Sequence, residues 1–166
     1  MEHLIVGTGR SGTQALARHY GAGHQTIRHA HVLGEPLPPL PEVEVSFEAV
    51  PIMGRFDCHK TLVVRHPAQV VMSWVHRGVF GDDMRSEYAL WSAVLDRHFP
   101  HVLTETTPAD RAARYWLEWN GYAATYADEV RRLDDMGIEV VDATDPPIVG
   151  FRSLLARECY RWWRSV

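Results

Sequence analysis

The sequence predicts an α/β domain of three layers, in which a mostly parallel central sheet lies between two layers of helices. Short apolar runs alternate along the chain with longer segments of helical periodicity. Two of these runs, 4–6 and 60–65, are each followed by a tight turn and then by a helical segment. Because parallel strands are joined by crossovers that usually contain a helix, this order favours a parallel sheet covered on both faces.

Local signals define the elements of the first half. Gly7 interrupts the first apolar run, and Pro67 stands where a helix can begin. The prolines in 34–41 exclude regular structure there, so this segment is expected to be a loop. We expect strands at 4–6, 43–47 and 60–65, and helices at 14–20 and 67–76.

The second half is predicted to be mainly helical. Thr107 can cap a helix whose first position is Pro108, and Gly137 can end it. We expect a loop at 79–86, helices at 86–97, 107–136 and 151–163, and a strand at 138–141. No linker or repeat divides the sequence, so residues 1–166 are expected to form one domain.

Composition narrows the classes of protein that this chain can belong to. Hydrophobic residues make up 46% and charged residues 23% of the chain, which is typical of a globular domain. The net charge of −4 lacks the basic surplus of a general nucleic-acid binder, so we expect no nucleic-acid partner. Cys58 and Cys159 have neither zinc-site nor disulfide-framework spacing. Without a membrane-length apolar run or a signal-peptide pattern, a cytoplasmic protein with no membrane partner is expected.

The first chemical motif is the segment Gly7-Thr8-Gly9-Arg10-Ser11-Gly12-Thr13. It lies between a predicted strand and a predicted helix, where backbone N–H groups and the helix N-terminus can bind an anion. Its Gly-x-x-x-x-Gly spacing is that of a nucleotide-binding loop. Thr13-Gln14 stands where a Walker loop has Lys-Ser or Lys-Thr, which argues against an ordinary ATPase or kinase. The cation of this loop is Arg10.

The second motif joins Arg65, at the end of a predicted strand, to Ser73, eight residues later in a predicted helix. The strand ends of doubly wound sheets face the ligand crevice. Arg65 could therefore bind a phosphate as a charged fork, with the Ser73 hydroxyl as a further donor. For either residue alone, a structural role on the surface would be the better interpretation.

Together the two motifs resemble the sulfotransferases that use 3′-phosphoadenosine 5′-phosphosulfate (PAPS), above all short bacterial-type members with "GTGRSGT" loops. In that family a basic residue followed by Ser-Gly-Thr binds the 5′-phosphosulfate, and a strand-ending Arg with a Ser eight residues later binds the 3′-phosphate. Two further segments, 45–51 and 111–120, are similar to the family's "VSW-x-AAP" and "RAARYWxxWN" patterns. The resemblance implies a fold like that of the P-loop nucleoside triphosphate hydrolases.

The implied function is transfer of a sulfuryl group from PAPS to a hydroxyl or amine, with release of 3′-phosphoadenosine 5′-phosphate (PAP). The acceptor would be a small molecule or a glycan, and no metal is expected because Arg10 can supply the positive charge at the leaving phosphate. The residues implied in cofactor binding are Gly9, Arg10, Ser11, Gly12, Thr13, Gln14, Arg65 and Ser73.

The general base is open between two residues. Short members often carry a His-Glu pair after the second strand, and here His31 fits the histidine while Val32 replaces the glutamate. We expect His31 or the displaced Glu35 to act as the base, with His29 third. A purely structural role for these histidines is an equal alternative. Two other functions also stay open: a small-molecule kinase with a degenerate phosphate loop, and a non-catalytic nucleotide-binding module.

Overall fold

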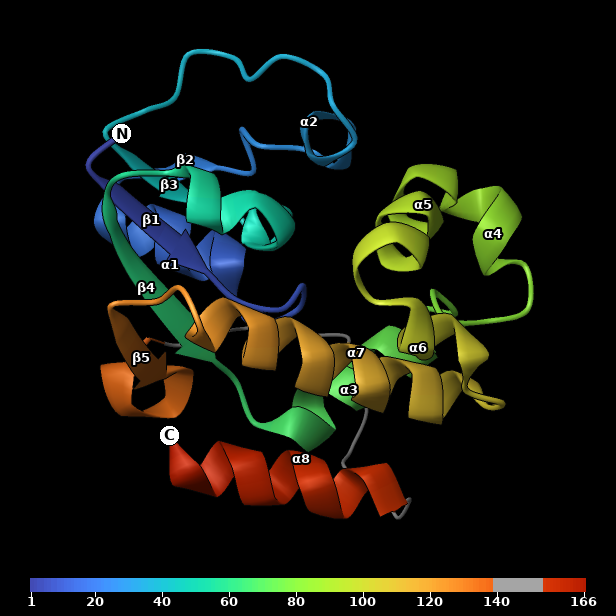
Figure 1. Cartoon of the computed structure of the whole chain (residues 1–166). Coiled ribbons are helices and arrows are strands. Elements are labelled where there is room, and N and C mark those ends of the chain that lie inside the picture. Colours follow the sequence, from blue (N-terminus) through green and yellow to red (C-terminus); the bar gives the residue numbers. More distant parts are fainter. Residues whose placement is uncertain (139–153) are drawn as a thin grey trace.

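The computed structural model describes residues 1–138 and 154–166 and contains a sheet of five parallel strands (Figure 1). The strands lie in the order β2-β3-β1-β4-β5. Every neighbouring pair is parallel, so the predicted α/β class and parallel sheet are confirmed. Their bounds are β1 His3–Val6, β2 Gly23–His24, β3 Val43–Val45, β4 His59–Val64 and β5 Glu129–Arg132.

Helices cover both faces of this sheet (Figure 1). The α-helices are α1 Thr13–Tyr20, α2 His29–Val32, α3 Pro67–His76, α4 Met84–Glu87, α5 Ala89–His98, α6 Pro100–Thr104, α7 Pro108–Ala124 and α8 Leu154–Ser165. Two 3-10 helices, η1 Val50–Arg55 and η2 Leu133–Met136, complete the described elements.

The side chains of β1 alternate between the two faces, as the twofold period of a strand requires. Ile5 packs with Leu16 and Ala17 of α1 in one apolar cluster. Leu4 and Val6 belong to a larger cluster on the opposite face, which includes buried residues of α3, α7 and α8. Each face of β1 is therefore covered by apolar helix residues, and the domain has three layers.

The strand order places two loops at the same edge of the sheet. The chain runs from β1 to β2 and β3 on one side of β1, and then crosses to β4 and β5 on the other side (Figure 1). Ligands of open α/β sheets bind at the carboxyl ends of the strands where the order reverses in this way. β1 ends at Val6, before the glycine-rich loop, and β4 ends at Val64, before Arg65. Both sequence motifs therefore lie at this reversal point.

The predicted helix 107–136 is wrong in its second part. Its start is confirmed, because the Thr107 hydroxyl accepts a hydrogen bond from the Asp110 N–H at 3.1 Å. The helix ends at Ala124, however, and residues 129–132 form β5, which pairs with β4. Backbone pairing with the edge of β4 outweighs the local helical preference of this segment.

Most of the other predicted elements are present with different bounds, and the predicted loop 79–86 is helical from Met84 onward. The predicted helix 86–97 is two helices, because Tyr88 has a non-helical backbone (φ −125°, ψ 50°) between α4 and α5. The predicted helix 151–163 is found as α8 from Leu154 onward. The predicted strand 138–141 and the first residues of that last helix fall largely outside the described residues.

Candidate functional site

The loop between β1 and α1 curls tightly at its centre. The Ser11 N–H donates to the Thr8 carbonyl at 3.0 Å, and the Ser11 hydroxyl donates to the same oxygen. Arg10 and Gly12 have φ values of 70° and 82°, in the left-handed region. Glycine is the residue that adopts this conformation without strain, and Gly12 directly precedes the first turn of α1. That first turn supplies N–H groups that have no acceptor within the helix.

Aromatic side chains form hydrogen bonds with the backbone of the loop. The Trp119 indole donates to the Gly7 carbonyl at 3.2 Å, and the Trp74 indole donates to the Gly9 carbonyl at 3.1 Å. The Gly9 N–H in turn donates to the Tyr115 hydroxyl at 3.2 Å. These contacts fix the loop backbone, and they also engage the Gly9 N–H that was expected to contact the cofactor.

Arg10, Arg65 and Ser73 meet beside the loop. The Arg10 Nε donates to the Ser73 hydroxyl at 2.8 Å, and the Arg65 Nη1 donates to the Arg10 carbonyl at 3.0 Å. Arg65 Nε also donates to Gln69 Oε1 at 3.0 Å. Arg65 is only 7% exposed and Ser73 only 2% exposed. The structure thus brings together cofactor candidates from two distant motifs and binds them to the loop.

The remaining cofactor candidates lie at the start of α1. Thr13 is nearly buried, and its hydroxyl lies 3.3 Å from Nε2 of His24 on β2. Gln14, the next residue, has an exposed side chain.

The two leading base candidates, His31 and Glu35, lie on or just after α2. Nδ1 of His31 accepts a hydrogen bond from the Arg28 N–H at 2.9 Å, which caps the start of this short helix. Glu35 is exposed. Neither residue lines the cavity described next, and their catalytic role stays a prediction.

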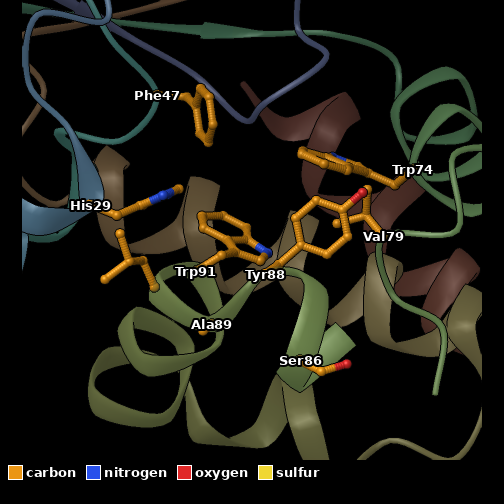
Figure 2. Close-up of a pocket in the computed structure, with 9 residues that line it drawn as sticks. His29, Phe47, Trp74, Val79, Ser86, Tyr88, Ala89 and Trp91 are labelled. Atoms are coloured by element: carbon orange, nitrogen blue, oxygen red, sulfur yellow. The ribbon is translucent and has the colours of Figure 1, made fainter. Parts of the chain in front are cut away.

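A cavity of about 440 Å³ adjoins the loop (Figure 2). Its wall includes Trp74, whose indole bonds the Gly9 carbonyl, so the cavity and the loop share one side chain. His29, the third base candidate, also lines it. The lining residues are His29, Phe47, Trp74, Val79, Ser86, Tyr88, Ala89, Leu90 and Trp91.

His29 is paired with a buried carboxylate, Glu48. The Glu48 Oε2 atom accepts from the His29 N–H at 2.6 Å and lies 3.3 Å from Nδ1 of the same residue. Arg28 lies 3.6 Å from the other carboxylate oxygen. Burial lowers the pKa of His29 to about 4, and burial raises the pKa of the Glu48 carboxyl. His29 is therefore neutral near pH 7. A proton on Nδ1, facing Glu48, would leave Nε2 as a hydrogen-bond acceptor.

Sequence reasoning missed Glu48 as a site residue. Its signal in the sequence is the segment 45–51, which is similar to the family pattern and which also contains Phe47 of the cavity wall. Among the described residues, no group of three or more His, Cys, Asp or Glu is arranged to hold a metal ion. None of the described helices is both long and apolar enough to cross a bilayer.

Comparison with protein-family models, with curated proteins and with solved structures gives no match for this chain.

Proposed function

We propose that this protein is a sulfotransferase that moves the sulfuryl group of PAPS to an acceptor hydroxyl or amine and releases PAP. The observation that carries the proposal is the hydrogen-bonded group of Arg10, Arg65 and Ser73 at the carboxyl ends of β1 and β4. Residues 55 and 63 positions apart have no local reason to meet, and ligands of this fold class bind at that edge.

The donor set suits a nucleotide with phosphates at two positions. The first-turn amides of α1 fit the 5′ end, since a helix N-terminus favours an anion. The guanidinium of Arg65 and the hydroxyl of Ser73 fit the 3′-phosphate. Both groups are nearly buried against the loop, so a phosphate would reach them by a shift of the Arg10 side chain that now bonds Ser73.

The proposed reaction requires side chains of this protein in two roles. Arg10 stabilises the negative charge that develops on the bridging oxygen as the bond from sulfur to that oxygen breaks. A base takes the acceptor proton while the new bond to sulfur forms. His31 and Glu35 are the candidates from the sequence, and the position of His29 in a cavity beside Gly9 favours His29 for this task.

The first prediction concerns nucleotide selectivity, measured by calorimetry with PAP, AMP, ADP and ATP. AMP differs from PAP only in the 3′-phosphate, which Arg65 and Ser73 are proposed to bind. Hydrogen bonds to charged groups contribute about 1.5–3 kcal/mol each, so PAP should bind at least about tenfold more tightly than AMP or ADP. Ser73→Ala should weaken PAP binding and leave AMP binding unchanged.

His76→Ala is the matched control, because His76 lies on the same helix with an exposed side chain. Equal affinities for PAP and AMP would exclude the sulfotransferase. Tighter, magnesium-dependent binding of ATP would favour the small-molecule kinase. Selective PAP binding by a protein that transfers no sulfuryl group to any acceptor would favour the non-catalytic module.

A further inference from the structure

The wall of the cavity is almost entirely apolar. Four aromatic side chains and three aliphatic ones make up most of it, and none of its nine residues carries a formal charge at neutral pH, because His29 is neutral there. A sugar needs many hydrogen-bonding partners, and an anion needs a cation or several donors. The cavity offers neither. Its volume of about 440 Å³ suits one small organic molecule.

Ring faces and edges shape the inside of this space (Figure 2). The rings of Trp74 and Trp91 are nearly parallel, with centroids 6.2 Å apart, and Phe47 meets Trp91 edge-on at 5.9 Å. Tyr88 and Leu90 are 37% and 55% exposed. They line the same cavity and give it an apolar entrance. Flat aromatic molecules pack well against such rings.

Two buried nitrogen atoms are the polar features of the inner wall. Neither Nε2 of His29 nor Nε1 of Trp91 has a hydrogen-bond partner within the described part of the chain. Figure 2 shows the imidazole of His29 directed between Phe47 and Trp91. A buried polar atom without a partner is costly, and a small turn of the imidazole would let a ligand hydroxyl donate to Nε2.

We propose that this cavity is the acceptor site and takes a flat, uncharged aromatic molecule with one hydroxyl group, which donates to Nε2 of His29. The role of this molecule as the sulfuryl acceptor rests on the proposed function, whereas its binding in the cavity does not depend on that function. The Trp74 indole holds Gly9 and lines the cavity, so a hydroxyl bound there lies beside the loop that is proposed to hold the sulfuryl donor. His29 would then receive the hydroxyl proton as the new bond to sulfur forms.

The second prediction uses 2-naphthol, 2-methoxynaphthalene and glucose as probes in calorimetry with the whole chain. We expect 2-naphthol to bind and glucose to give no heat of binding. The methoxy compound lacks the donor hydrogen, so it should bind about fivefold more weakly, the usual contribution of one neutral hydrogen bond. His29→Phe should remove this difference by weakening only 2-naphthol. His76→Phe, exposed on α3, is the matched control and should preserve the difference.

Ala89→Trp keeps the test independent of the histidine. Ala89 lines the cavity but is exposed, so the larger side chain can fill the space without disturbing the core. It should weaken 2-naphthol binding by about tenfold or more, through loss of the packing area of a ring, and leave PAP binding unchanged. Binding of 2-naphthol that is unaffected by Ala89→Trp, or equal binding of glucose, would overturn the proposal.

The two proposals fail in different ways. If PAP binds selectively and 2-naphthol does not bind, the sulfotransferase proposal stands and the acceptor site is wrong. If 2-naphthol binds in the cavity and the protein binds PAP no more tightly than AMP, the aromatic binding site is supported. The sulfotransferase proposal is then wrong, and so is the role of the cavity as an acceptor site.

Discussion

His29 illustrates what the sequence can and cannot predict about a single residue. The sequence offers histidines at positions 29 and 31, and the family resemblance ranks His31 above His29. Which of them turns inward depends on where the short helix α2 begins, because residues two positions apart lie on different sides of a helix. The partner of His29, Glu48, lies 19 positions away, so only the folded chain reveals the pair.

The third prediction follows from the lowered pKa of His29. Between pH 6.5 and about 4, an unfolded histidine binds a proton while the buried one in the native state does not. Acidification therefore favours the unfolded state, by up to about 3 kcal/mol across this range. His29→Gln cannot take up this proton. Urea unfolding at pH 7, 5.5 and 4.5 should show a smaller loss of stability in the variant than in the wild type.

Glu48 acts in the opposite direction, which is why the comparison must be made between proteins that both contain it. Its raised pKa lets the native state bind a proton at a higher pH than the unfolded state, so acidification stabilises the fold through this group. His76→Gln, at an exposed position, should follow the wild-type curve. Parallel curves for the wild type and His29→Gln would show that His29 does not have the lowered pKa.

Among the helices and strands, local sequence signals correctly predict where helices begin, but they do not predict which segments pair as strands. The glycine pattern predicts the loop and α1, and Thr107 with Pro108 predicts the start of α7. The end of α7 was misplaced because residues 129–132 become a strand only through the edge that β4 offers them. No periodicity within the segment reports that edge, so the sequence could not define this strand.

Helix α7 also does more than fill the core. Its aromatic residues Tyr115 and Trp119 are fully buried. Their polar ends nevertheless bind the backbone of the loop at Gly9 and Gly7. Burial raises the pKa of Tyr115 well above its ordinary value, so its hydroxyl stays neutral and available as the acceptor for the Gly9 N–H.

The fourth prediction is that Tyr115→Phe destabilises the fold and weakens PAP binding together. The variant leaves the Gly9 N–H buried without its acceptor, which costs about 1–3 kcal/mol. Urea unfolding and calorimetry with PAP measure the two effects. Tyr20→Phe, on exposed Tyr20 at the end of α1, is the control and should change neither. A Tyr115→Phe protein with lower stability and wild-type PAP affinity would show that this contact does not shape the loop.

At the scale of the whole molecule, the position of the candidate site depends on the order of the strands in the sheet, which the sequence did not predict. Alternating strands and helices indicate a parallel sheet, but not that β1 lies between β3 and β4. This order alone brings the loop after β1 beside Arg65 after β4. On the face opposite α1, α8 belongs to the same apolar core as α3 and α7. The rings of Trp116 and Trp162 meet edge-on at 5.4 Å, and Cys159 is fully buried next to the Ala113 carbonyl of α7.

The last prediction is that α8 unfolds only with the rest of the domain. In Cys58→Ser, Cys159 is the single thiol, and burial raises its pKa to about 12, so it cannot react while α8 is docked. Labelling with a disulfide reagent at pH 8 should be at least about a thousandfold slower in the native than in the unfolded protein. Low urea concentrations should accelerate it with the slope of global unfolding, because unfolding exposes surface to urea. A labelling rate that does not respond to urea would mean that α8 detaches locally, and that the core formed with α3 and α7 is not one cooperative unit.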